Sequence, residues 1–202
     1  MDIVVIRYHA GNIQSVLFAL ERMGYNARVT DDARLIRSAD RVIFPGVGEA
    51  SSAMAYLKAR KLDEVIRSLS QPVLGICLGM QLMASHSEEN DTACLGIFPE
   101  EVKKFPTPDG MPSSTGLKVP QMGWNQISNL QSPLFEGVRN GAYVYFVHSY
   151  YIPCCSYTIA TSHYGIAYSA AIQRDQFYAV QFHPEKSAEV GERILKNFIH
   201  LS

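Results

Sequence analysis

The strongest constraint on this chain is the run Gly75 to Gly79, in which an apolar segment leads directly into a cysteine. Residues 72–76 read as a buried strand, and the residues after Cys77 fit a helix. A sharp strand-to-helix turn pushes a nucleophile clear of the backbone, and glycines two positions before and after it remove side chains that would clash. The amides at the start of a helix favour a thiolate over a thiol. The run therefore predicts a nucleophile elbow at Cys77, with an inert buried cysteine as the alternative.

A second segment near the end of the chain, residues 177–187, is another apolar strand that ends in a histidine and a glutamate. A cysteine nucleophile needs a base, and the base needs a group that orients it. His183 can take the thiol proton and return it to a leaving amine, while Glu185 holds the imidazole in one tautomer. For this pair alone, an ordinary loop before the last helix is the alternative. Together with the elbow, the pair predicts a Cys-His-Glu triad.

A third segment, residues 45–48, reads Pro-Gly-Val-Gly and follows the apolar strand 41–44. A turn with two glycines presents backbone amides with little side chain around them. Beside the elbow, the amides of Val47 and Leu78 would form an oxyanion hole for a tetrahedral intermediate. An ordinary strand-to-helix turn is the alternative.

These three segments together resemble the class I glutamine amidotransferases, and the resemblance spans nearly the whole chain. Within that class, residues 119–125 (Val-Pro-Gln-Met-Gly-Trp-Asn) and 145–150 (Tyr-Phe-Val-His-Ser-Tyr) are similar to the glutaminase subunits of imidazole glycerol phosphate synthase. The resemblance implies hydrolysis of glutamine and transfer of the ammonia, within a heterodimer, to a barrel-type cyclase subunit. That subunit makes imidazole glycerol phosphate and an aminoimidazole carboxamide ribotide in histidine biosynthesis. The chemistry implies no metal and no organic cofactor on this chain.

The resemblance also implies which residues meet glutamine and which meet the partner. Glu89 matches the carboxylate that binds the substrate's ammonium group, although a solvated helix end is the alternative for it. The implied substrate-binding residues are Gly48, Gln81, Glu89, His148, Ser149 and Tyr150. The implied partner-facing residues are Asn12, Ser15, Trp124, Tyr145 and Lys186.

Two segments depart from the family pattern. The family commonly has histidine where this chain has Gln121, and Asp-Tyr-Gly where it has Arg7-Tyr8-His9. Neither departure touches the triad, but both leave open a glutaminase paralogue that supplies ammonia to a different synthase. A cysteine peptidase or deglycase of similar fold stays as a rival, without a reason for Gln81 and Glu89. A second rival is a catalytically inactive subunit that only binds a partner, and the intact set of Cys77, His183 and Glu185 argues against it.

The composition of the chain agrees with this interpretation and limits the number of domains and the kinds of partner. With 202 residues, 47% of them hydrophobic, residues 1–202 are expected to form a single domain with an ample core. A net charge of −1 and the lack of basic runs argue against nucleic acid and anionic membranes as partners. The chain opens without a basic leader, and no apolar run approaches the ~20 residues of a membrane span, so we expect a cytoplasmic protein. The four cysteines, two of them adjacent, suggest reduced thiols and no metal site.

The order of expected elements predicts the fold class. Strands and helices alternate in the first ninety residues, which is typical of parallel α/β units, whereas strands follow one another later. The expected strands are 3–6, 26–29, 41–44, 73–76, 124–127, 143–151, 157–162, 168–173 and 177–182, and the named helices are 12–23 and 188–199. The proline-containing stretch 103–118 is expected to be a long loop. We therefore predict an α/β fold with a central mixed, mostly parallel sheet flanked by helices and a β-rich excursion in the C-terminal half.

Overall fold

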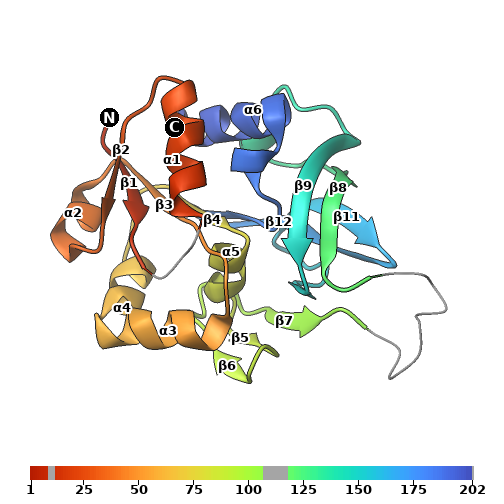
Figure 1. The fold of residues 1–202 in the computed structure, drawn as a ribbon, viewed down its shortest axis with the longest axis horizontal. Helices are drawn as coiled ribbons and strands as arrows, with labels where there is room; N and C mark the ends of the chain where they lie inside the picture. Colours follow the sequence, from red (N-terminus) through yellow and green to blue (C-terminus); the bar gives the residue numbers. More distant parts are fainter. Residues whose placement is uncertain (9–11, 107–117, 202) are drawn as a thin grey trace.

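A seven-stranded mixed sheet forms the centre of the computed structural model, which describes residues 1–8, 12–106 and 118–201 (Figure 1). The strand order is β11-β12-β13-β4-β3-β1-β2. The five strands from β13 to β2 pair in parallel, and β12 and β11 add antiparallel pairs at one edge. The bounds are Ile3–Ile6 (β1), Ala27–Thr30 (β2), Arg41–Phe44 (β3), Val73–Ile76 (β4), Thr158–Tyr164 (β11), Ile166–Arg174 (β12) and Phe177–Val180 (β13). The predicted fold class is confirmed.

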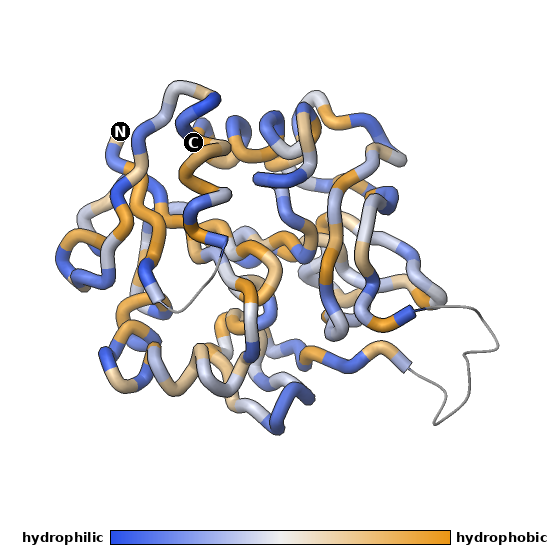
Figure 2. Tube along the Cα trace, viewed as in Figure 1, coloured by the Kyte–Doolittle hydropathy of each residue, from blue (hydrophilic) through white to orange (hydrophobic). Residues whose placement is uncertain are grey.

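Helices cover both faces of this sheet because side chains alternate across each strand. Val4 and Ile6 pack toward α2, α3, α4 and α5, whereas Ile3 and Val5 pack toward α1 and α6. In Figure 1, α1 and α6 lie on one side of the sheet and α3 and α4 on the other. The helices are Ile13–Arg22 (α1), Ala33–Ser38 (α2), Ala50–Ala59 (α3), Leu62–Arg67 (α4), Leu78–Met83 (α5) and Ala188–Ile199 (α6). Figure 2 shows the hydrophobic residues concentrated along the central strands between these layers.

The β-rich excursion consists of a two-stranded ribbon and a small sheet. The ribbon pairs β8 (Gln121–Ile127) with β9 (Ala142–His148) in antiparallel fashion. The small sheet has the order β10-β7-β5-β6. Its strands are Tyr150–Tyr151 (β10), Glu101–Lys104 (β7), His86–Ser87 (β5) and Thr92–Ala93 (β6), and two 3₁₀ turns complete the chain at Pro133–Phe135 (η1) and Pro184–Lys186 (η2). Among the described residues, no helix is long and apolar enough to cross a membrane.

The structure corrects two of the expected elements. The strand expected over 143–151 divides at Ser149 into β9 and β10, which belong to different sheets. The loop expected over 103–118 begins inside strand β7, while residues 107–117 lie outside the described part of the chain. Both errors have one cause: β7 and β10 are short and pair with each other across 46 residues, from Lys104 to Tyr150, so no local pattern reveals them.

Candidate active site

Cys77 lies between β4 and α5 in a backbone conformation that residues other than glycine rarely adopt. Its φ is 53° and its ψ is −108°. Its amide donates a hydrogen bond to the Val180 carbonyl at 2.8 Å, which ties the turn to the end of β13. A Cβ added at Gly79 would overlap the Phe44 carbonyl oxygen, and one added at Gly75 would lie 3.1 Å from the Gly79 backbone. The two glycines thus allow β3, the turn and α5 to approach one another closely.

His183 and Glu185 are both buried, and the Nδ1 of the imidazole lies 2.8 Å from the carboxylate Oε1. Because a carboxylate oxygen only accepts, Nδ1 carries a proton and Nε2 is left for the cysteine. Nε2 has no hydrogen-bond partner among the residues that the structure describes. Burial lowers the pKa of His183, but its interactions with Cys77, followed by the hydrogen bond and charge of Glu185, outweigh burial and raise the pKa to about 10. The pair is suited to accept and hold a proton.

Backbone and side-chain contacts fix the loop that carries this pair. The His183 amide donates to the Tyr145 carbonyl at 2.8 Å. The Ser187 hydroxyl donates to the His183 carbonyl at 2.6 Å and accepts from the Tyr145 amide at 3.0 Å. The Asn12 side-chain amide donates to Glu185 Oε1 at 3.2 Å. The loop after β13 is therefore anchored both to β9 and to the start of α1.

A cavity of about 290 Å³ opens beside Cys77, and its size suits a small molecule. Its lining contains every residue predicted for the oxyanion hole and for substrate binding, although these residues come from segments that are far apart in the sequence. Its lining is Val47, Gly48, Cys77, Leu78, Gln81, Glu89, Pro120, Val147, His148, Ser149 and Tyr150. His183 and Glu185 are not part of the lining, and both side chains are buried.

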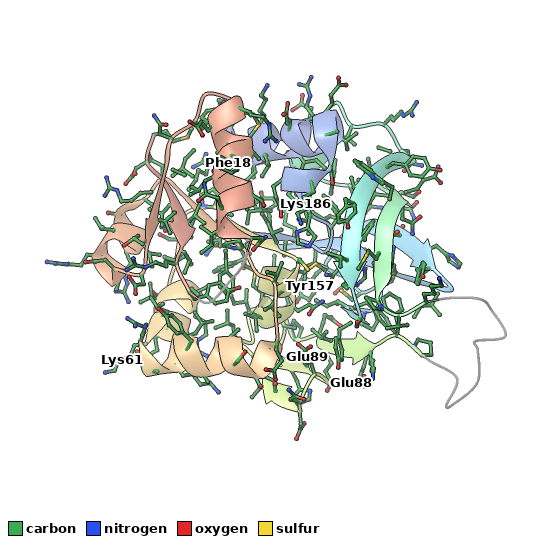
Figure 3. The ribbon with its side chains drawn as sticks, in the orientation of Figure 1. Phe18, Lys61, Glu88, Glu89, Tyr157 and Lys186 are labelled. Carbon is green, nitrogen blue, oxygen red and sulfur yellow. The ribbon has the colours of Figure 1, made fainter. Side chains whose placement is uncertain are left out.

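The side chains of Gln81 and Glu89, both predicted to bind substrate, already make hydrogen bonds inside the protein. Gln81 Nε2 donates to the Tyr150 carbonyl and to Gln181 Oε1, both at 3.0 Å. With both amide hydrogens engaged, Gln81 can offer a ligand only its carbonyl oxygen. Glu89 Oε2 accepts from the Ala50 amide at 2.7 Å, and burial raises the pKa of Glu89 although this bond opposes the shift. Glu89 belongs to the segment between β5 and β6 rather than to a helix end (Figure 3).

His148 is a buried neutral histidine at the cavity wall. Its Nδ1 lies 2.7 Å from the Tyr150 carbonyl, and since a carbonyl only accepts, Nδ1 carries the proton. Burial, with a smaller effect of the charge of His183, lowers the pKa of His148 to about 4 against the opposing effect of the Tyr150 bond. His148 is therefore uncharged at neutral pH. The Tyr150 carbonyl accepts from both His148 and Gln81, which fixes this end of the cavity.

The Pro45–Gly48 turn presents a carbonyl to the elbow. The Leu78 amide donates to the Gly46 carbonyl at 3.2 Å. Because the Gly46–Val47 peptide is planar and trans, the Val47 amide points the opposite way. Gly48 has a φ of 119°, which favours glycine. In this structure the two amides predicted for the oxyanion hole do not converge on one point.

Three of the five predicted partner-facing residues gather in one cluster beside the triad. The ring of Trp124 lies edge-on to that of Tyr145 with centroids 6.2 Å apart, and Lys186 Nζ lies 5.9 Å from the Tyr145 ring centroid. Figure 3 labels Lys186. Trp124 and Lys186 are exposed. Ser15 is partly exposed on α1. Asn12, in contrast, is buried and reaches the triad through Glu185.

The structure adds residues that the sequence interpretation missed. Gln181 Nε2 donates to the sulfur of Cys77 at 3.6 Å, and the same sulfur lies 3.8 Å from the Val147 carbonyl. The sequence did contain a signal for Gln181. It lies two positions before His183, and residues two apart in an extended segment point to the same face, so its side chain could be expected on the side of His183. Val147 acts through its backbone and Pro120 lines the cavity from a loop, so neither carries a side-chain signal.

Two residues that depart from the family pattern, Gln121 and Arg7, make no contact with the triad among the described residues. Gln121 is buried opposite His148 in the β8–β9 register, and its Oε1 accepts from the Tyr168 hydroxyl at 3.0 Å. Arg7 pairs with Asp31 at 2.5 Å. His9 lies outside the described residues.

Comparisons with known proteins agree with this geometry. The family model described as glutamine amidotransferase class-I matches residues 4–201. Two curated relatives named imidazole glycerol phosphate synthase subunit HisH, from Bacteroides thetaiotaomicron and Bacteroides fragilis, are 53% and 54% identical over 201 residues, with 100% of each chain covered. A chain of the PurLQS structure from Thermotoga maritima matches with a TM-score of 0.70 and 14% identity over 98% of this chain and 97% of that one. The last likeness concerns the fold alone.

Proposed function

Because this chain belongs to the class I glutamine amidotransferases and is more than half identical to HisH subunits over its full length, we propose that it is a glutaminase supplying ammonia to a cyclase subunit. The observation that carries the proposal is the buried His183–Glu185 pair behind Cys77, at the wall of a cavity suited to a small molecule. The cyclase is of the barrel type, the complex is a heterodimer, and the product serves histidine biosynthesis. A cytoplasmic location is part of the same proposal.

The first half of the reaction transfers the γ-glutamyl group to sulfur. His183 takes the thiol proton, and the Cys77 sulfur attacks the side-chain carbonyl carbon of glutamine. The electron pair of the carbonyl moves to its oxygen and gives a tetrahedral intermediate. His183 then protonates the amide nitrogen, the C–N bond breaks, and ammonia leaves behind a γ-glutamyl thioester. Glu185 stabilises the imidazolium that forms in between.

The second half returns the enzyme to its starting state. A water molecule attacks the thioester carbonyl while His183 takes its proton. The C–S bond breaks, glutamate leaves, and the proton returns to sulfur. Glu89 offers a carboxylate to the ammonium group of the bound amino acid at the cavity rim, and Gln81 offers its carbonyl oxygen.

Stabilising the oxyanion requires a change in the Pro45–Gly48 turn. The Gly46–Val47 peptide has to rotate so that the Val47 amide takes the place of the Gly46 carbonyl beside the Leu78 amide. Gly46, which flanks that peptide on one side, has no side chain to hinder the rotation. We propose that the cyclase partner, once occupied by its nucleotide substrate, favours the rotated turn, which keeps the isolated chain a poor glutaminase.

Replacing Cys77 by alanine tests the proposed function. We expect the complex of the Cys77→Ala variant with the cyclase to lose synthesis from glutamine and to keep synthesis from added ammonium salt, because the cyclase needs ammonia and not this thiol. Product formation from each nitrogen source is measured in parallel. Cys154→Ala is a matched control, since Cys154 is exposed and outside the cavity, and it should keep both activities. Glutamine-dependent turnover that persists without Cys77 would contradict the proposal.

A further inference from the structure

We propose that Gln181 is a further catalytic residue, whose side-chain amide donates a hydrogen bond to the sulfur of Cys77 and stabilises the thiolate. The proposal rests on the proposed function for its role in turnover. Gln181 is fully buried, and its Nε2 lies 3.6 Å from Cys77 Sγ, within the range of a hydrogen bond to sulfur. It comes from the segment that follows β13, two residues before His183. One short stretch of chain thus brings both the base and a donor to the nucleophile.

The direction of this amide follows from its neighbours. The Tyr150 carbonyl can only accept, so the atom of Gln81 that lies 3.0 Å from it must be the amide nitrogen. The same nitrogen lies 3.0 Å from Gln181, where its second hydrogen needs an acceptor, so Gln181 turns its carbonyl oxygen toward Gln81. The amide nitrogen of Gln181 is then directed at Cys77. An exchange of oxygen and nitrogen on either glutamine would place two donors or two acceptors face to face.

The surroundings of the sulfur give this donor a distinct role. A thiol can donate its hydrogen to the Val147 carbonyl at 3.8 Å, but a thiolate cannot, and that carbonyl then repels it. The Gln181 amide offers a buried thiolate a compensating donor, and hydrogen bonds to a charged group are the stronger kind. Gln81 acts through Gln181 and is a positioning residue in this network, in addition to its place in the cavity wall.

The titratable groups around the sulfur belong to several elements, and they all remain in the variants used below. Those whose charges interact with that of the cysteine, or that line the same cavity, are His183, Tyr8, Glu89, His148 and Tyr150. Variants of the same chain are therefore compared, so that these groups contribute equally to the pH dependence of Cys77 reactivity in each variant.

The experiment measures alkylation of Cys77 by iodoacetamide from pH 5 to pH 10 in the full chain, quantified by mass spectrometry of the peptide that holds Cys77. Gln181→Met removes the donor and keeps the length of the side chain. We expect the midpoint of its rate–pH profile to move to higher pH and the rate at pH 6 to fall about tenfold, while the plateau at pH 10 stays within about twofold of wild type. Gln181→Glu keeps an acceptor for the Gln81 amide but places a negative charge beside the sulfur of Cys77. Its midpoint should therefore move to a higher pH than that of Gln181→Met.

Three comparisons separate this role from packing. Gln71→Met is a matched control, because Gln71 donates to the Ile36 carbonyl at 2.8 Å near the opposite end of β4, and its profile should equal that of wild type. Gln81→Met should also move the midpoint of the rate–pH profile to higher pH, but by less than Gln181→Met does. The double variant, Gln81→Met with Gln181→Met, should move the midpoint no further than Gln181→Met alone. Thermal unfolding monitored by circular dichroism shows that each variant is folded.

An unchanged midpoint in folded Gln181→Met and Gln181→Glu would overturn the proposal. A lower plateau at pH 10 with an unchanged midpoint would also overturn it, since that result shows only a displaced cysteine. A wild-type complex that fails to hydrolyse glutamine, while the midpoint still moves in Gln181→Met, would count against the proposed function and leave the hydrogen bond to Cys77 in place. A moved midpoint with glutaminase turnover reduced in the same variant supports both.

Discussion

The carboxylate of Glu185 is buried together with His183, and it accepts hydrogen bonds from His183 and Asn12 at 2.8 Å and 3.2 Å. A buried carboxylate is stable only when such donors compensate for the loss of water. Both donors lie on Oε1, and Oε2 has no partner among the described residues. The charge of Glu185 therefore lies beside the imidazole, where the proposed proton transfer would take place.

We expect Glu185→Gln to bind glutamine with little change and to lose most of the turnover rate. The amide keeps the shape of the side chain but no longer stabilises the imidazolium, and removal of the equivalent acid in subtilisin lowers kcat ~3 × 10⁴-fold. Steady-state glutaminase kinetics in the complex, giving kcat and KM separately, provide the measurement. A kcat within about twofold of wild type would show that Glu185 does not orient the base.

Because His148 is buried in its neutral form, we expect the folded chain to lose stability in acid. Its pKa in the folded chain is about 4, below the ~6.5 of an unfolded chain, so the unfolded state binds more protons between these values. The stability is fully present above pH 6.5 and declines as the pH falls toward 4, by about 3 kcal/mol at pH 4. His148→Asn keeps a donor for the Tyr150 carbonyl but does not titrate.

Urea unfolding at pH 7 and pH 4 measures this effect. The free energy of unfolding should fall less in His148→Asn than in wild type over that interval, and the difference between the two declines is the contribution of His148. Equal declines in both proteins would show that His148 does not carry the acid sensitivity.

The position of Cys77 depends on how closely α5 lies against β3. Gly79, in the first turn of α5, has no room for a Cβ because the Phe44 carbonyl oxygen occupies that space. Gly46 is similarly enclosed, with Leu78 Cβ 2.8 Å from its hypothetical Cβ, and the Tyr8 hydroxyl donates to the Pro45 carbonyl beside it. The elbow, the start of α5 and the oxyanion turn thus form one tightly packed unit.

We expect Gly79→Ala to reduce glutaminase turnover at least about a hundredfold, since displacing a reacting group by 1 Å costs about that much. Its free energy of unfolding should fall by about 1–3 kcal/mol through overpacking. Gly24→Ala is the control, because Gly24 has a φ of 83° but nothing within 4 Å of its hypothetical Cβ. That variant should lose about 1–2 kcal/mol to backbone strain and keep its turnover in the complex. Normal turnover in Gly79→Ala would contradict the close packing of α5.

In the folded chain, the surface that the proposed partner would contact lies close to the triad, since the Tyr145 carbonyl accepts a hydrogen bond from the His183 amide. The cluster of Trp124, Tyr145 and Lys186 joins the exposed side of the ribbon to η2, which also carries Glu185. Docking against this cluster can favour one state of the Pro45–Gly48 turn only if its contacts differ between the two states. Lys186, exposed and next to Glu185, is placed to make such contacts.

We expect glutaminase turnover to rise at least about tenfold from the isolated chain to the complex saturated with the cyclase's nucleotide substrate. One missing oxyanion donor costs ~10²–10³ in kcat, which leaves room for a rise of this size. Glutamate release is measured for the chain alone, for the complex, and for the complex with nucleotide. Equal rates in the three states would rule out regulation through the turn.

From the sequence alone, local patterns were enough to predict the parallel strands of the first half, the helix that ends the chain and the places where Cys77, His183 and Glu185 would lie. Their signals are short-range: alternation within a strand, apolar spacing within a helix, and glycines at a turn. The pairing of β7 with β10 and the division of the strand expected over 143–151 were not predictable, because those contacts join residues distant in sequence.

The type of sheet and the positions of the candidate catalytic side chains could thus be predicted from the sequence, since both follow from side-chain type and local period. How the polar atoms pair depends on the tertiary structure. It directs the amide of Gln181 toward Cys77, turns the Gly46 carbonyl toward the Leu78 amide, and buries His148 in its neutral form. Hydrogen bonds are directional and burial depends on every neighbouring element, so neither can be deduced from the order of residues along one strand.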